Sequence, residues 1–254
     1  MTTRETVLLL GRDHTRWEAI DLRTSGRCRT AASTSVGGDY VRAWKGDLEH
    51  PNEDCAAVVE QGPRTLLAVF DGHTGSRASH VAAQAVAAIA PPASLDELLQ
   101  SLRGGLLSAS SDPADFSATT MILAVLDRDA GRAFGLSFGD SSVVRFGADA
   151  EALADKLDDF IVPWGRMDLG DEDVRTFSIA MQPGDDLAVY TDGVDECHRH
   201  QPETSVSLED LVAVRREMGA TPVTFCAGAV QLALAGVRGH PGGEDNVTFA
   251  VSRA

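Results

Sequence analysis

The sequence predicts an α+β fold in which antiparallel strand pairs and helices form separate layers. Apolar runs come in pairs joined by short turns rich in Gly, Pro and Asp, as in β-hairpins. The helical segments gather in two places and do not follow each strand in turn, which disfavours a parallel βαβ sheet. A chain of 254 residues is long enough to bury one large core, and no Ser/Gly-rich linker, repeat or low-complexity tract divides it. We therefore expect a single domain over residues 1–254.

Ten apolar runs have the length and side-chain content of strands. The predicted strands are residues 7–10, 17–22, 55–60, 65–70, 119–126, 132–138, 143–146, 175–180, 186–190 and 246–252. Residues 37–54 read as a polar, glycine-containing loop, and residues 1–36 are expected to add edge strands to the same domain.

Four helices are predicted from their starts and stops. The Ala-rich stretch 76–90 has no internal Gly or Pro and ends before a Pro-Pro pair. Ser94 and Ser207 are placed as N-caps of helices that run to about residues 102 and 218. Thr221-Pro222 opens a fourth helix that runs to about residue 235.

The composition excludes some function classes. A formal net charge of −16 disfavours nucleic-acid binding, which needs clustered Lys and Arg. No apolar run is long enough to span a bilayer, and the first residues lack the pattern of a signal peptide. The four cysteines are widely spaced and read as reduced, buried thiols: Cys28, Cys55, Cys197 and Cys226. We expect a cytoplasmic protein with no membrane partner.

Acids stand at the ends of several predicted strands. The strand at 65–70 ends in Asp71-Gly72-His73, which on its own favours a turn over a chemical site, because Asp-Gly is common in turns. Further strand-end acids are Glu53, Asp54, Asp192, Asp195, Glu196 and Asp245. Each alone could be a solvated loop carboxylate, but acids that converge at one sheet edge without basic partners would be costly to bury. A hard divalent cation such as Mg²⁺ or Mn²⁺ would offset that cost.

Five short motifs occur in the order and spacing of one family. They are Asp71-Gly72-His73-x-Gly75, Thr119-Thr120, Gly139-Asp140-Ser141, Thr191-Asp192-Gly193 and Asp245-Asn246-Val247-Thr248. In these motifs, over residues 52–252, the chain resembles the metal-dependent type 2C protein serine/threonine phosphatases, in their bacterial form with a single catalytic domain. The resemblance implies a four-layer α/β/β/α sandwich, two antiparallel sheets flanked by helices, with a dinuclear metal site at one end. It also implies a substrate protein phosphorylated by a Ser/Thr kinase.

The resemblance implies a role for each site residue. It implies two Mn²⁺ or Mg²⁺ ions, with a third, weaker one in some members, and Asp71 as the ligand that bridges the first two. The first ion would be held by Asp192 and Asp245, and the second by Glu53 and the Gly72 carbonyl. The third would be held by Asp140 and Glu196. Asp54 would orient metal-bound water, and His73 would be the general acid. A bridging hydroxide would then attack phosphorus in line, and the metals would offset charge on the phosphoryl oxygens.

The chain departs from the family where substrate binds. Glu49 stands where the family has a phosphate-binding Arg, Ser142 replaces another Arg, and Thr74 replaces a glycine. Arg42 or Lys45 could serve the phosphate from the same loop, or both could be solvated surface charges. Three functions therefore remain open: a phosphoprotein phosphatase, a phosphatase of a small phosphorylated metabolite, and a weakly active or inactive module that binds phosphoproteins.

Overall fold

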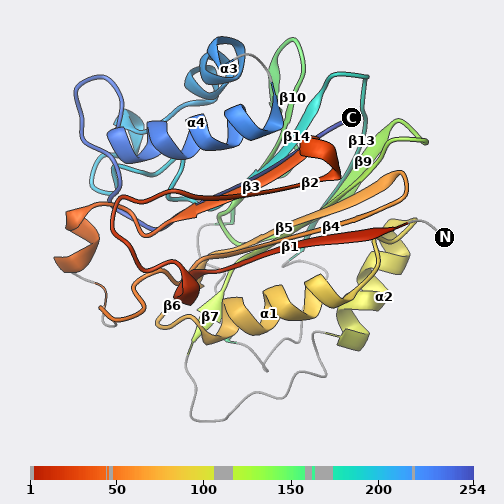
Figure 1. Cartoon of the computed structure of the whole chain (residues 1–254), viewed down its shortest axis with the longest axis horizontal. Helices are drawn as coiled ribbons and strands as arrows, with labels where there is room; N and C mark the ends of the chain where they lie inside the picture. Colours follow the sequence, from red (N-terminus) through yellow and green to blue (C-terminus); the bar gives the residue numbers. More distant parts are fainter. Residues whose placement is uncertain are drawn as a thin grey trace.

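The protein is a sandwich of two six-stranded antiparallel sheets with helices on both outer faces (Figure 1). The computed structural model describes residues 3–43, 45, 48–105, 117–157, 162–163, 174–218 and 221–254. Three positions of the predicted loop 37–54, namely 44, 46 and 47, lie outside these residues. The four-layer α/β/β/α order that the resemblance implied is confirmed.

Neighbouring strands follow the order of the chain in the first large sheet but not in the second. The first sheet consists of β1 (Arg4–Leu10), β4 (Cys55–Gln61), β5 (Arg64–Phe70), β8 (Met121–Asp127), β9 (Arg132–Phe138) and β13 (Arg175–Ala180), in that spatial order. The second consists of β11 (Ala150–Ala152), β10 (Ser142–Phe146), β14 (Asp186–Tyr190), β15 (Val247–Arg253), β3 (Thr30–Ser35) and β2 (Asp21–Ser25). A small third sheet joins β12 (Val162–Pro163), β7 (Ala118–Thr119) and β6 (Gly72–His73).

Two helix pairs cover the outer faces. Helices α1 (Arg77–Ala88) and α2 (Leu95–Gly105) lie on the first sheet, and α3 (Leu208–Glu217) and α4 (Pro222–Ala235) lie on the second (Figure 1). The two predicted N-caps are confirmed, since Ser94 and Ser207 each accept a hydrogen bond from the backbone N–H three residues on. Thr221 does the same at the start of α4, the helix that Thr221-Pro222 was expected to open. No helix within the described residues is long and apolar enough to cross a membrane.

The core has three apolar layers because the central strands are buried on both faces. In β5, Leu66, Ala68 and Phe70 pack toward α1, whereas Leu67 and Val69 pack between the sheets. This alternation is the two-residue period of a strand. Burial on both faces explains why the sequence of β5 is continuously apolar and easy to recognise.

The N-terminal strands differ from the prediction. The strand expected at 17–22 begins later, at Asp21, because Glu18 lies in a turn with a φ of 57°. Strand β3 was not predicted, since its sequence TAASTS has few large apolar residues although all six are buried. Its hydroxyls pair across the sheet instead, Thr30 with Ser252 at 2.9 Å and Thr34 with Thr248 at 2.8 Å. Strands β1 and β2 are edge strands, but β3 lies between β15 and β2, so the prediction of edge strands alone was wrong for β3.

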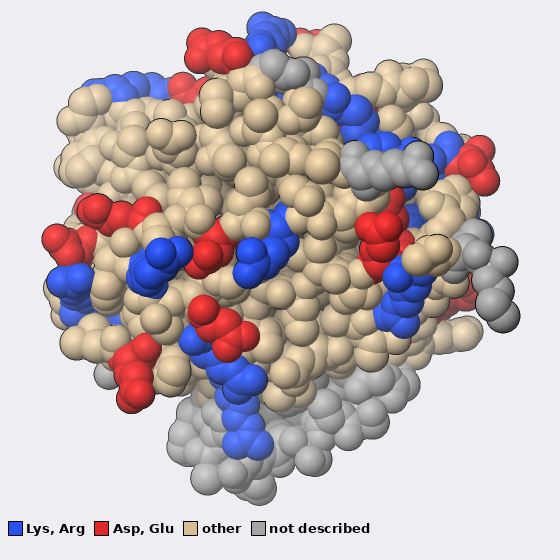
Figure 2. Space-filling view, in the orientation of Figure 1, with Lys and Arg blue, Asp and Glu red and all other residues tan. Residues whose placement is uncertain are grey.

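The charged groups on one broad face of the molecule are mixed. Figure 2 shows acidic and basic side chains interspersed over this face, with large areas that carry neither. The excess of acids in the sequence therefore does not gather into one patch there.

Candidate active site

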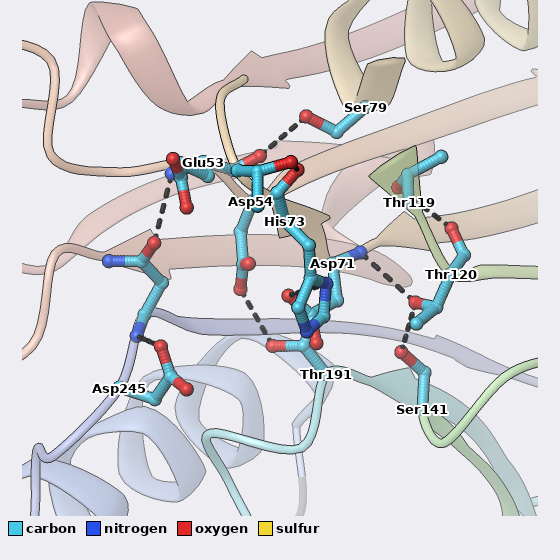
Figure 3. A network of polar contacts seen from close by, with 12 residues as sticks. Glu53, Asp54, Asp71, His73, Ser79, Thr119, Thr120, Ser141, Thr191 and Asp245 are labelled. Atoms are coloured by element: carbon cyan, nitrogen blue, oxygen red, sulfur yellow. Dashed lines mark hydrogen bonds and ion pairs between the residues drawn. The ribbon is translucent and has the colours of Figure 1, made fainter. Parts of the chain in front are cut away.

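The predicted acids come together at one end of the sandwich. Cys55 at the start of β4 pairs with Phe70 at the end of β5, so Glu53 and Asp54 lie beside Asp71. The same antiparallel geometry in the second sheet pairs Tyr190 with Phe249, near the positions of Asp192 and Asp245. Figure 3 shows the side chains of Asp54, Asp71, His73 and Asp245 directed toward a common space.

Three of the acids form a tight cluster. Asp71, Asp140 and Asp192 each offer an oxygen, and these oxygens lie within 4.8 Å of one another. Asp71 Oδ2 and Asp140 Oδ1 are buried and have no hydrogen-bond partner among the described residues. Oxygen ligands at this spacing, two of them unsatisfied, fit a hard divalent cation.

The pKa values of the acids are raised because the carboxyl groups are buried close to one another. Burial and the nearby Asp192 raise the pKa of Asp71 well above its ordinary value. The same two causes raise the pKa of Asp140 to about 7 and that of Asp245 to about 8. Burial also raises the pKa of Asp54 to about 6, although a hydrogen bond from Thr191 opposes it. A bound cation would favour all four ionised forms, so the donor set fits a metal on electrostatic grounds as well.

Lys45 is buried inside the site, contrary to the interpretation of its charge as a solvated surface group. Its Nζ lies 2.5 Å from Glu53 Oε2 and 3.9 Å from Asp245 Oδ1, and the side chain is 5% exposed. Burial lowers the Lys45 pKa, but Asp245 and Glu53 together raise it above its ordinary value. Lys45 thus supplies positive charge next to two of the predicted ligands.

The other loop residues considered for phosphate binding lie outside the acid cluster. Arg42 is half exposed, forms an ion pair with Asp39 at 3.4 Å, and stacks over the Trp17 ring at 4.6 Å. Glu49 is exposed. Lys45 is therefore the loop cation that the structure places beside two of the predicted metal ligands, Glu53 and Asp245.

Polar side chains behind the acids fix their backbone. Asn246 Oδ1 accepts from the Glu53 N–H at 2.9 Å, and its Nδ2 donates to the carbonyls of Val36 and Pro51. Thr191 Oγ1 donates to Asp54 Oδ2 at 2.7 Å (Figure 3). Sequence reasoning recognised Asn246 and Thr191 only as motif letters and missed these roles. The available signal was a polar residue directly beside a strand-end acid.

A third such residue supports the Asp71 turn. Thr120 Oγ1 accepts from the Asp71 N–H at 3.2 Å and is paired with Ser141 at 2.8 Å. Thr120 also donates its N–H to the Asp71 carbonyl at 3.0 Å. Both backbone groups of Asp71 are thereby held at the sheet end.

Two glycines are required because backbone segments meet at the site. A Cβ on Gly72 would lie 2.3 Å from the Glu53 carbonyl oxygen, and one on Gly193 would lie 1.8 Å from the Asn246 carbonyl oxygen. Both distances are far below van der Waals contact. The glycines therefore allow the acid-bearing segments to approach each other, while the role of the Gly72 carbonyl as a ligand stays a prediction.

His73 faces the acids from β6. Its Nδ1 lies 3.6 Å from Asp71 Oδ1 and is buried without a hydrogen-bond partner in the described part of the chain. Burial lowers the pKa of His73, which makes the protonated imidazole a stronger acid but a less populated one at neutral pH. The next residue, Thr74, adopts a φ of 58°, a region in which the family's glycine would be less strained.

Glu196 is not one of the three acids whose oxygens lie within 4.8 Å of one another, although its charge contributes to the raised pKa of Asp140. Its Oε1 accepts from Lys156 Nζ at 3.1 Å, and Lys156 also binds Asp195 at 2.7 Å. Ser142, which replaces the second family Arg, donates to Asp195 Oδ2 at 3.0 Å. Of the two residues expected at the third metal position, Asp140 joins Asp71 and Asp192, whereas Glu196 is paired with Lys156.

Comparisons with known proteins agree with this fold. The family model for Stage II sporulation protein E (SpoIIE) matches residues 63–254. The structure of a bacterial serine phosphatase superposes with a TM-score of 0.67 at 16% identity, over 94% of this chain and 99% of that one. The Mycobacterium tuberculosis serine/threonine phosphatase PstP/Ppp superposes with a TM-score of 0.64 at 20% identity, over 91% and 98%.

Two further structures are described as holding metal ions. The catalytic domain of the serine/threonine phosphatase PstP in complex with two manganese ions has a TM-score of 0.66 at 19% identity, over 92% of this chain and 99% of that one. RsbX in complex with magnesium has a TM-score of 0.60 at 11% identity, over 100% and 99%. No curated protein matches the chain. The matched family model, which spans most of the chain, and the sandwich fold with strand-end acids lead to one conclusion: this chain belongs to the SpoIIE family and has the type 2C phosphatase fold.

Proposed function

We propose that the chain is a single metal-dependent phosphatase domain, over residues 1–254, that hydrolyses phosphoserine and phosphothreonine in proteins. The observation that carries this proposal is the convergence of Asp71, Asp140 and Asp192, with two unsatisfied oxygens, on the type 2C phosphatase fold. A buried acid cluster of this kind has a clear use in binding cations and a large cost otherwise. The substrate would be a protein phosphorylated by a Ser/Thr kinase.

The metal ligands are proposed to be Asp71, Asp192, Asp245, Glu53 and the Gly72 carbonyl, with Asp140 and Glu196 available to a third ion. Mn²⁺ or Mg²⁺ fits this oxygen set, and the neighbours described with manganese and magnesium support that choice. When bound, such ions lower the pKa of water and neutralise charge on phosphoryl oxygens. For Glu196 to take part, it would have to leave Lys156.

Asp54 and His73 have different roles in proton transfer. Thr191 fixes one oxygen of Asp54 at 2.7 Å, so the carboxylate is held in place to accept a hydrogen bond from the attacking water. His73, which borders the same space and is 28% exposed, donates a proton to the departing serine or threonine oxygen. The alkoxide is a poor leaving group, so this proton matters most for alkyl phosphates.

Lys45 is proposed to bind the substrate phosphate in place of the missing family Arg. Its ammonium is paired with Glu53 and lies near Asp245. Cations bound to those carboxylates would weaken the ion pairs and leave the ammonium available to a phosphate dianion. A lysine serves phosphate as a point charge, without the two-pronged geometry of a guanidinium.

The test is phosphate release from a matched panel of substrates by the purified chain with Mn²⁺ or Mg²⁺. We expect turnover of phosphoserine and phosphothreonine peptides, loss of that turnover in excess EDTA, and loss in Asp71→Asn. Hydrolysis confined to small phosphorylated metabolites would assign the metabolite-phosphatase function instead. Phosphopeptide binding without turnover of any panel member would assign the binding-module function. Full activity in EDTA would refute metal dependence.

A further inference from the structure

A groove of about 660 Å³ lies against the loop that carries Asp245. Three acids line it, Glu18, Asp39 and Glu244, together with the apolar or aromatic side chains of Ile20, Leu234 and Tyr40. We refer to it as the acidic groove. Its volume is within the range of pockets that take small ligands or single side chains.

The walls of the acidic groove are fixed by backbone contacts. The N–H of Gly38 donates to the Gly243 carbonyl at 2.7 Å, and that of Glu18 donates to the Gly37 carbonyl at 3.0 Å. A Cβ on Gly37, whose φ is 95°, would lie 2.3 Å from the Asp245 carbonyl oxygen. Three segments far apart in the sequence are thus held together, and the groove is preformed.

Glu244, one of the residues that line the groove, has an unsatisfied carboxylate oxygen that is shielded from solvent. The residue is 7% exposed, and its Oε2 is buried with no hydrogen-bond partner in the part of the chain that the structure describes. Its Oε1 lies 4.0 Å from His198 Nε2, at the limit of an ion pair. This buried carboxylate therefore adds negative charge beneath the wall of the groove, which favours a cationic group inside it.

The groove has negative charge but no basic lining residue. Among the described residues, those that line it include no Lys or Arg, although the exposed Asp39 forms an ion pair with Arg42 at 3.4 Å. The apolar side chains of Ile20 and Leu234 offer contact for the methylene stem of a long side chain. Acids with an apolar floor match the chemistry of a Lys or Arg side chain.

The groove adjoins the proposed catalytic centre. Glu244 and the predicted metal ligand Asp245 are consecutive, so their Cα atoms are about 3.8 Å apart. A peptide with its phosphoryl group at the acids could therefore extend a neighbouring residue toward the groove. We propose that the acidic groove binds a Lys or Arg side chain of the substrate protein, close in sequence to the phosphorylated residue. This proposal rests on the proposed phosphoprotein phosphatase function.

An arginine scan tests the groove. Phosphoserine peptides with alanine at all flanking positions would carry one arginine at each position in turn. We expect one or two neighbouring positions to raise kcat/KM at least about fivefold over the all-alanine peptide. Glu18→Gln and Glu244→Gln should reduce that preference to below about twofold, since each removes one negative charge without changing side-chain shape.

The readout is a ratio of two substrates on the same variant, so a general loss of activity cancels. Asp129→Asn is the matched control, because Asp129 is exposed in the turn between β8 and β9, at the end of these strands away from Asp71. This control should keep the full arginine preference. Glu18 is exposed, so Glu18→Gln gives a result even if Glu244→Gln misfolds.

A binding measurement separates the groove from the activity. Fluorescence anisotropy of the unphosphorylated arginine peptide in EDTA should show binding that Glu18→Gln weakens and the alanine peptide lacks. Hydrolysis with a flat arginine scan would overturn the groove proposal and leave the phosphatase function intact. No hydrolysis of any peptide would overturn the phosphatase function, and the anisotropy would then decide on the groove. Equal binding of the two peptides, or no binding below about 1 mM, would overturn the groove.

Discussion

Replacing Asp140 by asparagine should stabilise the metal-free protein while weakening its response to metal. Asp140 lies within 4.8 Å of oxygens from Asp71 and Asp192, and its Oδ1 has no hydrogen-bond partner among the described residues. Burial and Asp192 raise its pKa to about 7. The folded protein therefore binds a proton here that the unfolded chain has already lost, between about pH 4 and pH 7.

The sign and size of the effect follow from that difference. Stability falls with rising pH wherever the folded state binds more protons, so the Asp140 penalty is absent below about pH 4 and complete above about pH 7. A rise of the pKa from 3.8 to about 7 corresponds to about 4 kcal/mol as an upper bound. Coupling among the neighbouring acids and partial solvation of Asp140 reduce it, and we expect a gain of about 1–2 kcal/mol for Asp140→Asn at pH 8 in EDTA. For a domain of this size that is a rise in Tm of about 2–8 °C.

The assay is thermal unfolding of wild type and variant at pH 4.5 and pH 8, each with EDTA and with Mn²⁺. In EDTA the variant should exceed the wild type at pH 8 and match it closely at pH 4.5. With Mn²⁺ at pH 8 the difference in Tm between variant and wild type should become smaller or change sign, because the variant has lost one anionic ligand. Asp129→Asn changes the same charge in an exposed turn and should alter stability by no more than about 0.5 kcal/mol.

One result would refute the reasoning. If Asp140→Asn is less stable than wild type in EDTA at pH 8, the carboxylate makes a net favourable contact in the metal-free state. The acid cluster would then carry no repulsive penalty for a cation to relieve.

Three further predictions concern His73, the phosphate-binding loop and Gly72. His73→Ala should lower kcat by about 10²-fold on a phosphoserine peptide and much less on an aryl phosphate with a good leaving group; equal losses in steady-state kinetics would make His73 structural. Lys45→Met should raise KM for phosphopeptides by up to about tenfold, whereas Glu49→Arg should leave KM nearly unchanged. If instead Glu49→Arg lowered KM and Lys45→Met had no effect, the phosphate would be bound at position 49 and not by Lys45. Gly72→Ala should reduce both Tm and the Mn²⁺-induced rise in Tm, because the added Cβ would lie 2.3 Å from a backbone oxygen. The control is Gly184→Ala, at a position with open space around it and a φ of 93°. It should cost only about 1–2 kcal/mol of backbone strain and leave the Mn²⁺-induced rise in Tm unchanged.

The parts of the fold that could be predicted are those in which local pattern and burial agree. Strands β4, β5, β8 and β9 are buried on both faces, so their sequences are continuous apolar runs between turn residues. The N-caps were predictable because Ser or Thr at a cap bonds within its own first turn. Strand β3 was not predictable, because its buried hydroxyl groups are hydrogen-bonded to a strand more than 200 residues away in the sequence.

The site shows the same division. The acids could be found in the sequence because each follows or precedes a recognisable strand, and antiparallel pairing then brings their ends together. The position of Lys45 could not, because a side chain from a polar loop reaches the acids only through the tertiary fold. The Glu196–Lys156 pair was missed for the same reason, since no local pattern links residues 40 positions apart.

The proposed metal site and the proposed phosphate-binding residue depend on different parts of the structure. The acids are carried on strand ends whose register is set by two large sheets and reinforced by Asn246 and Thr191, so no single loop determines their geometry. Lys45 and Glu49, by contrast, lie in the loop before β4, where the chain departs from the family. Substitution of Lys45 should therefore change KM, whereas substitutions at Asn246 or Thr191 should change metal affinity. The loss of the family's arginine is thus compatible with the proposed metal centre, because the sheets, and not the loop, position the acids proposed as its ligands.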